Sequence, residues 1–227
     1  STLGTSTAGL MAGGTPPTTG ATEEWGGSTW ANGGSLSTAR YGLATMGTQT
    51  AALAAGGESP YMTNVEEYNG SSWTSGTNMP TATSNAYRVG NSTTDLYVAG
   101  GYTPSATTTT HKWNGTSWTT SGAMGRTATG SGGSFSGSPT AGLAFGGNAD
   151  PPITADSEEY NGSSWTEGNN LTESFDDLTG AGTQTAAISN LPSSNTTLAY
   201  NGSVWTAFGS PGNQITSRLE VSSQYGS

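Results

Sequence analysis

A short hairpin motif that occurs five times constrains the fold of this 227-residue chain more than any other feature. Each copy has a leading aromatic residue, a Gly-containing pair, two further residues and a closing Trp. The leading aromatics are 43, 45, 47 and 40 residues apart, and a period in this range is typical of stacked or radial repeat architectures. The five copies are Trp25–Trp30, Tyr68–Trp73, Trp113–Trp118, Tyr160–Trp165 and Tyr200–Trp205.

The Asn-Gly pair in four of the copies predicts a tight hairpin, because a two-residue type I′ turn needs positive φ at both of its positions. With Asn69-Gly70 as that turn, we expect Tyr68 to pair with Ser71 and Glu66 to pair with Trp73. Side chains alternate between the two faces of a strand, and directly paired residues share a face. Tyr68, Glu66 and Trp73 are therefore expected on one face of the sheet.

Two further strands are predicted before each hairpin. The nearer one is apolar and ends at a Gly pair, which permits positive φ and the close approach of a neighbouring backbone or ring. Four short strands per repeat are one blade of a β-propeller. The apolar strands are Leu10–Gly14, Leu53–Gly57, Tyr97–Gly101, Leu143–Gly147 and, without the Gly pair, Ala187–Asn190. The strands before them are expected at 39–44, 86–89, 126–129 and 178–181.

This combination of an apolar strand, a Gly pair, a Tyr and a Trp resembles the Kelch repeat, and the resemblance spans nearly the whole chain. The third unit fits best, with Leu96–Gly101 followed by Trp113 and Trp118. The interval between Tyr and Trp is shorter than in typical Kelch repeats, and the fifth unit lacks its Gly pair. The Tyr-Asn-Gly-Ser-x-Trp-Thr motif is most similar to the Kelch-like arrays of predicted phage and marine-microbial surface proteins. The resemblance implies a propeller fold.

The two ends of the chain predict how the ring closes. We expect the chain to begin at the second strand of a blade, within 8–14, and Thr216–Val221 to supply that blade's first strand. The predicted fold is all-β: a single-domain, five-bladed β-propeller of four-stranded blades, closed by pairing of the N- and C-terminal strands within one blade. Closure removes free sheet edges. The predicted repeats are 1–35 with 215–227, 36–78, 79–123, 124–170 and 171–214.

Composition limits both the core and the partners. Leu, Ile, Val and Phe total 24 of 227 residues and the formal net charge is −10, values that by themselves favour disorder. The aromatics are in register, however, and each ring can bury about 150–250 Å². One Lys and four Arg cannot neutralise a phosphate backbone, so nucleic acid is not an expected partner. No run approaches the ~20 apolar residues of a membrane helix, so no membrane insertion is expected.

Few residues could carry catalysis. The chain has no Cys and one histidine, His111, so we expect no metal site, no cofactor and no enzymatic activity. Three carboxylate pairs are interpreted as solvated strand residues, because neighbours on a strand point to opposite faces and cannot converge: Glu23-Glu24, Glu66-Glu67 and Glu158-Glu159. The best candidate for a bound cation is Asn148 and Asp150 followed by Asp156 and Glu158, and the next is the segment 169–177. Neither matches a calcium-loop motif, so both are interpreted as polar loops.

The loops between the second and third strands of the blades are the predicted binding surface. They vary while the scaffold repeats, and each contains Pro, which fixes φ and stiffens the loop. Tyr61 and Tyr102 lie in two neighbouring loops and are expected to form one patch, since such amphipathic rings are enriched at interfaces. The predicted binding residues are Tyr61, Tyr102, Glu58, Asn148 and Asp150.

These observations predict a non-catalytic propeller, extracellular or on a virion surface, that binds a protein or glycan partner or decorates a larger assembly. One alternative is a glycan-active propeller enzyme. Sialidase-like enzymes need an arginine cluster, and oxidase-like enzymes need copper ligands that include His, with Cys for their cofactor. A second alternative is an intracellular Kelch-type adaptor, which the near absence of Lys and the Ser/Thr/Gly-rich surface disfavour.

Overall fold

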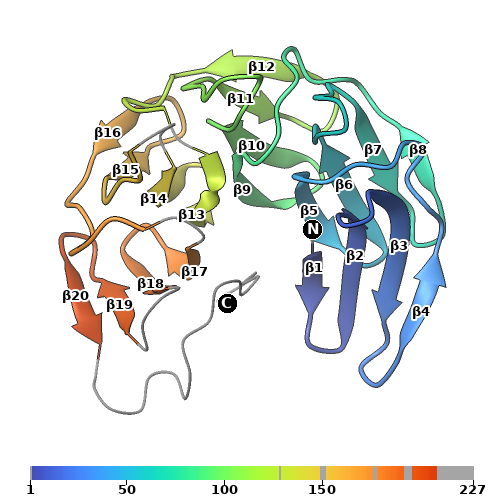
Figure 1. Ribbon diagram of the computed structural model, residues 1–227, viewed down its shortest axis with the longest axis horizontal. Helices are drawn as coiled ribbons and strands as arrows, with labels where there is room; N and C mark the ends of the chain where they lie inside the picture. Colours follow the sequence, from blue (N-terminus) through green and yellow to red (C-terminus); the bar gives the residue numbers. More distant parts are fainter. Residues whose placement is uncertain (1, 128, 149–151, 176–177, 192–195, 209–227) are drawn as a thin grey trace.

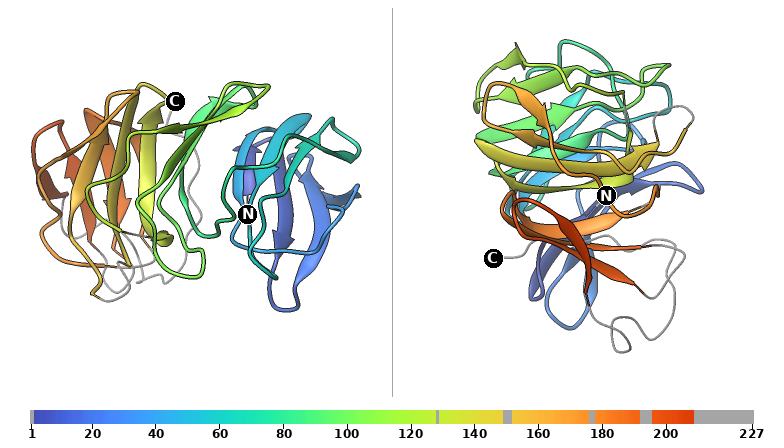
Figure 2. Two further views of the ribbon diagram at one scale, coloured as in Figure 1. Left: turned by 90° about the horizontal axis from the view of Figure 1, so that it is seen from above. Right: turned by 90° about the vertical axis from the view of Figure 1, so that its left-hand side faces the viewer.

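The computed structural model shows an all-β molecule of five four-stranded antiparallel sheets, a five-bladed β-propeller. It describes residues 2–127, 129–148, 152–175, 178–191 and 196–208. The sheets follow one another in chain order around a common centre (Figure 1). A view at 90° shows them as separate layers standing side by side (Figure 2).

Each blade runs from an inner first strand to an outer fourth strand. Blade 1 consists of β1 (Thr2–Thr5), β2 (Ala8–Gly14), β3 (Thr19–Trp25) and β4 (Trp30–Gly33). Blade 2 consists of β5 (Ala44–Thr48), β6 (Ala51–Ala55), β7 (Val65–Tyr68) and β8 (Trp73–Ser75). Blade 3 consists of β9 (Tyr87–Ser92), β10 (Asp95–Ala99), β11 (Thr110–Trp113) and β12 (Trp118–Ser121). Blade 4 consists of β13 (Thr129–Ser138), β14 (Ala141–Asn148), β15 (Ser157–Tyr160) and β16 (Trp165–Glu167). Blade 5 consists of β17 (Thr179–Thr183), β18 (Ala186–Asn190), β19 (Thr197–Tyr200) and β20 (Trp205–Phe208).

The hairpins form where the motif predicts them, but the predicted register is wrong by two residues. Tyr68 pairs directly with Trp73, so the connection has four residues and is not a two-residue type I′ turn. The Asn69 side chain explains the difference, because its Oδ1 accepts hydrogen bonds of 3.0 Å from the backbone N–H groups of Ser71 and Ser72. A shift of two residues keeps every side chain on its face, so Tyr68 and Trp73 share a face as expected.

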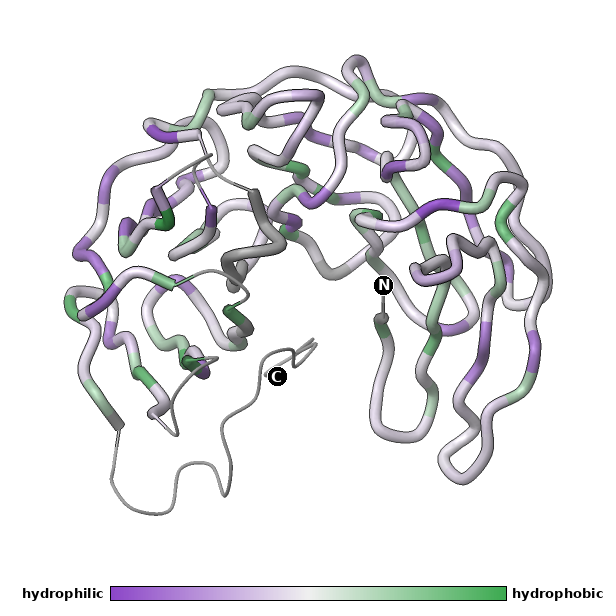
Figure 3. The backbone as a smooth tube through the Cα atoms, in the orientation of Figure 1, coloured by the Kyte–Doolittle hydropathy of each residue, from purple (hydrophilic) through white to green (hydrophobic). Residues whose placement is uncertain are grey.

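Consecutive blades pack face to face, and we call each such contact a seam. An apolar residue of the second strand in one blade meets the hairpin aromatics of the next blade. Between blades 1 and 2, Leu10 packs with Tyr68 and Trp73. Between blades 2 and 3, Leu53 packs with Trp113 and Trp118. Runs of hydrophobic residues are short and separate along the chain (Figure 3). The aromatic seams therefore supply much of the core.

Hydrogen bonds from the hairpin Trp residues also cross the seams. The indole N–H of Trp73 donates to Thr22 Oγ1 of blade 1 at 2.8 Å. The indole N–H of Trp165 likewise donates to Thr110 Oγ1 of blade 3 at 2.9 Å. Each of these blades is therefore joined to the preceding one by both apolar contact and a directed hydrogen bond.

The prediction for the N-terminal blade is wrong. β1 pairs with β2 over Thr2–Thr5, so the chain begins at the first strand of blade 1 and not at its second strand. β1 therefore occupies the edge of β2 at which the sequence predicts Thr216–Val221, and those C-terminal residues lie outside the described part of the chain. Among the described residues no strand joins blade 5 to blade 1, and the opening between these blades is wider than that between other neighbours (Figure 1).

The interpretation of Glu66 and Glu158 as solvated residues is also wrong. Glu66 is 1% exposed and forms an ion pair with the buried Arg40, with 2.6 Å between Oε1 and Nη1. Glu158 is 3% exposed, lies 3.9 Å from Arg126 Nε and accepts a 2.6 Å hydrogen bond from the N–H of Gly125. Burial of the carboxylate is tolerated because an arginine and a backbone donor lie beside it.

Candidate binding surface

The β6–β7 and β10–β11 loops, together with the segments that connect the blades, form one face of the propeller. In blades 2 and 3, the residue after the Gly pair extends β-type pairing to the segment that connects two blades. Glu58 exchanges backbone hydrogen bonds of 2.8 and 3.2 Å with Tyr41, and Tyr102 exchanges bonds of 2.9 and 3.0 Å with Ser84. These two backbone pairs anchor the side chains of blades 2 and 3 on this face.

Gly57 is required for that arrangement. Its φ is +109°, a conformation that L side chains rarely adopt, and an added Cβ would lie 2.9 Å from the carbonyl oxygen of Tyr41. The same Cβ would lie 2.7 Å from a methyl group of Leu43. The Gly pair predicted from the sequence thus ends β6 and lets the connecting segment approach Glu58.

Three tyrosines and one carboxylate meet at this face, and we call Tyr41, Glu58, Tyr61 and Tyr102 the tyrosine cluster. The ring centroids of Tyr61 and Tyr102 are 5.7 Å apart with an interplanar angle of 48°, a tilted contact within the favourable range for aromatic pairs. Ser84 Oγ donates a 3.3 Å hydrogen bond to Glu58 Oε2. All four side chains of the cluster are partly exposed, so they are fixed by neighbours yet accessible.

The electrostatics of the cluster favour the neutral form of two of its phenols, Tyr41 and Tyr61. Partial desolvation raises the pKa of Tyr41, and hydrogen bonding to Glu58 and the charge of that carboxylate raise it further. Desolvation and the Glu58 charge likewise raise the pKa of Tyr61, with smaller contributions from Tyr102 and Tyr41. Tyr41 and Tyr61 therefore present neutral hydroxyl groups beside the Glu58 carboxylate, which is an acceptor.

The structure brings together three of the five predicted binding residues: Tyr61, Tyr102 and Glu58. Asn148 occupies the position after the Gly pair in blade 4, where its backbone bridges to Ile153, so it belongs to a different blade from the tyrosine cluster. Asp150 lies outside the described residues. Sequence reasoning missed Tyr41, whose only signal is its place three residues before the first strand of blade 2.

Protein-family models and curated proteins were compared with this chain. Neither comparison gives a match. The candidate surface is therefore characterised by its own geometry.

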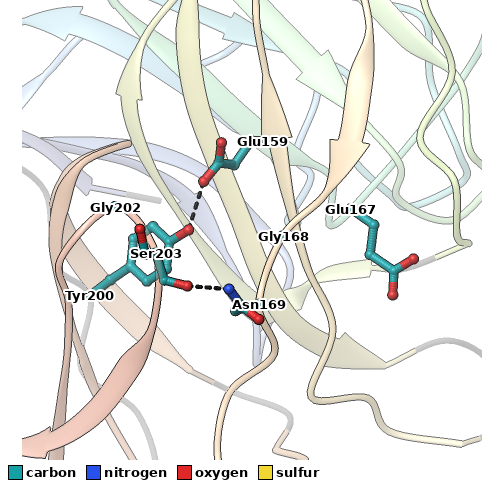
Figure 4. Close-up of a pocket in the computed structure, with 7 residues that line it drawn as sticks. All are labelled: Glu159, Glu167, Gly168, Asn169, Tyr200, Gly202 and Ser203. Atoms are coloured by element: carbon teal, nitrogen blue, oxygen red, sulfur yellow. Dashed lines mark hydrogen bonds between the residues drawn. The ribbon is translucent and has the colours of Figure 1, made fainter.

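A hollow of about 420 Å³, separate from the tyrosine cluster, lies at the seam between blades 4 and 5 (Figure 4). The Tyr200 hydroxyl donates a 2.6 Å hydrogen bond to Glu159 Oε1 across the seam, and desolvation together with this bond raises the pKa of Tyr200. Tyr68 makes the corresponding bond to Glu24 between blades 1 and 2, which identifies the contact as a repeated link between blades. The Glu167 carboxylate points away from Glu159 in Figure 4, so the two do not form an acid–base pair.

The other side chains that could act in catalysis or bind a metal ion do not lie together in the described residues. His111 is 4% exposed on β11 at the position that Glu66 and Glu158 occupy in their blades, and burial lowers its pKa. Within the described ranges, no three His, Cys, Asp or Glu side chains are grouped so that they could hold a metal ion. No helix in those ranges is long and apolar enough to cross a membrane.

Proposed function

We propose that this chain is a non-catalytic, Kelch-like binding propeller that acts outside the cell or on a virion surface. The observation that carries the proposal is the tyrosine cluster. Two loops and a connecting segment of a rigid scaffold hold three phenol rings and a carboxylate on one face. Loops positioned by a rigid scaffold are where recognition is usually located, and tyrosine is enriched at binding surfaces.

The partner that fits this surface is a polar or cationic group on a glycan or protein. The hydroxyls of Tyr41 and Tyr61 remain protonated, and Glu58 supplies an acceptor for hydroxyl or ammonium donors. Tyrosine rings also attract cations through their π faces. The net charge of −10 disfavours an anionic partner.

The test is a double substitution, Tyr61→Ser with Tyr102→Ser. Both rings are partly exposed, so the variant is expected to fold with an unchanged β-sheet circular dichroism spectrum. Its affinity is expected to fall at least tenfold, measured on glycan arrays or against the cell or virion surface that carries the protein. The matched control is Val204→Ser, which changes a 43%-exposed apolar side chain in the β19–β20 turn on the opposite face. Unchanged binding by the double variant, with loss in the control, would place the working surface on the turn face.

A further inference from the structure

The connections between the third and fourth strands of blades 2 to 5 contain an Asn-Gly pair and share one geometry. In each, the Asn Oδ1 accepts hydrogen bonds from the backbone N–H groups of the two residues that follow the Gly, over 2.8–3.0 Å. The backbone N–H of the same Asn donates to the carbonyl oxygen three residues later, over 3.2–3.3 Å. All four Asn side chains are exposed. The pairs are Asn69-Gly70, Asn114-Gly115, Asn161-Gly162 and Asn201-Gly202.

This geometry prepares the Asn side chain for attack by its own backbone. Two N–H donors on Oδ1 polarise the side-chain carbonyl and stabilise the negative charge that develops on its oxygen when a nucleophile reaches Cγ. The nearest nucleophile is the backbone nitrogen of the following Gly, which has no Cβ to hinder the approach. Within the described residues, the N–H groups of these four glycines have no hydrogen-bond partner. The carbonyl is therefore polarised while the attacking nitrogen is free.

We propose that these four turns are sites of self-modification, at which Asn is converted to Asp or iso-aspartate. The Gly nitrogen forms a bond to Asn Cγ, the bond between Cγ and Nδ2 breaks, and the proton from the Gly nitrogen leaves with the departing ammonia. One water molecule then opens the cyclic imide. Cleavage between Cγ and the Gly nitrogen gives Asp, and cleavage between the main-chain carbonyl carbon and that nitrogen gives iso-aspartate.

The turn can keep its fold when Asp is the product. A carboxylate oxygen accepts the same two N–H bonds, and an ionised acceptor makes them stronger. Blade 1 also shows that the connection closes without Asn, since Gly26 occupies that position and its N–H donates to the carbonyl oxygen of Thr29 at 3.0 Å. Modification is therefore compatible with the intact propeller.

The conversion changes the charge of one face of the molecule, and we call the face that carries these connections the turn face. The four turns, 69–72, 114–117, 161–164 and 201–204, contain no charged residue in the sequence. Conversion at all four makes each turn acidic and changes the formal net charge of the chain from −10 to −14. The turn face then repels anionic surfaces that it does not repel when it is neutral.

The chain contains a matched internal control, because a fifth Asn-Gly pair lies in a strand. Asn32 is exposed like the turn residues, but it belongs to β4 and pairs with Glu23 of β3, while Gly33 pairs with Thr22. Among the described residues, no hydrogen-bond donor contacts the Asn32 side chain. Cross-strand pairing also opposes the backbone rotation that closure of the imide ring needs. Asn32 is therefore expected to react slowly although its dipeptide is the same.

The test follows all five Asn-Gly sites in the folded full chain by peptide mapping during incubation in mildly alkaline buffer. Each turn site is expected to convert about tenfold faster than Asn32, because only the turns polarise the side-chain carbonyl. In urea the turn geometry is lost, and the five rates are expected to become equal. Conversion of Asn32 as fast as the turn sites in the folded chain, or a difference that persists in urea, would overturn the proposal.

A second measurement uses ion-exchange chromatography of the aged protein, in which each conversion gives a more acidic form. Asn161→Ser retains an oxygen that can accept the N–H bonds of the turn, and it is expected to reduce the early acidic forms from four to three. The matched control, Asn32→Ser, is expected to leave all four. Loss of an early form from the control, or the same four forms from Asn161→Ser, would refute the assignment of modification to the turns.

Discussion

Replacing a hairpin tryptophan with alanine should lower the free energy of unfolding by an amount set by the ring area that is buried in its seam. The chain contains a matched control for this substitution. Trp165 is 9% exposed between blades 3 and 4, while Trp30 has the same place in the motif but is 49% exposed. At about 200 Å² per ring and ~25 cal/mol per Å², the buried parts correspond to about 4–5 kcal/mol for Trp165 and about 2–3 kcal/mol for Trp30. The Trp165→Ala variant also loses the hydrogen bond from the indole N–H to Thr110 Oγ1.

The assays are thermal unfolding and equilibrium urea unfolding of Trp165→Ala and Trp30→Ala, both followed by circular dichroism. At about 2–4 °C per kcal/mol, the thermal midpoints should fall by roughly 10–15 °C for Trp165→Ala and about half as much for Trp30→Ala. An unchanged urea m-value would assign the loss to the folded state. Equal destabilisation by the two substitutions would refute the assignment of stability to seam burial.

Two further predictions concern buried side chains that can carry a charge. Arg40→Met should lower the free energy of unfolding by about 3–5 kcal/mol because it leaves the Glu66 carboxylate buried and unpaired, whereas Arg40→Met with Glu66→Leu should lose much less in the same urea assay. Burial lowers the His111 pKa below 6.5, so the unfolded chain binds a proton first and the stability from neutral His111 is lost as pH falls below about 6.5. Melts between pH 7.5 and pH 5 should show a smaller loss for His111→Gln; an identical pH dependence would exclude His111 as the cause.

The repeat, the blades and the aromatic faces could be predicted because their signals are local. Spacing of the hairpins and alternation along a strand are properties of a few neighbouring residues, and the observed pairing of Tyr68 with Trp73 keeps the predicted face. The turn itself could not be predicted from the Asn-Gly pair, because the Asn69 side chain competes for the backbone N–H groups that define the loop length.

Non-local partners account for the other errors. The burial of Glu66 depends on Arg40, which is distant in the sequence and belongs to a connecting segment without a strand signal. The strand Thr2–Thr5 consists of small residues with little apolar pattern, and its pairing with β2 defines it. For the candidate site, neighbouring loops predicted the approach of Tyr61 and Tyr102, while Tyr41 joins them only because the Gly57 backbone permits its approach to Glu58.

The pairing between the residue after a Gly pair and a connecting segment has a consequence for how such a surface diversifies. Glu58 with Tyr41 and Tyr102 with Ser84 occupy corresponding places whose backbones are held by paired hydrogen bonds, and the side chains of Glu58, Tyr41 and Tyr102 are partly exposed. Substitution at these three exposed places changes the chemistry of the surface while the backbone pairs remain. Under the proposed binding function, one blade can therefore change the side chain that it presents on this face while the neighbouring blades keep theirs.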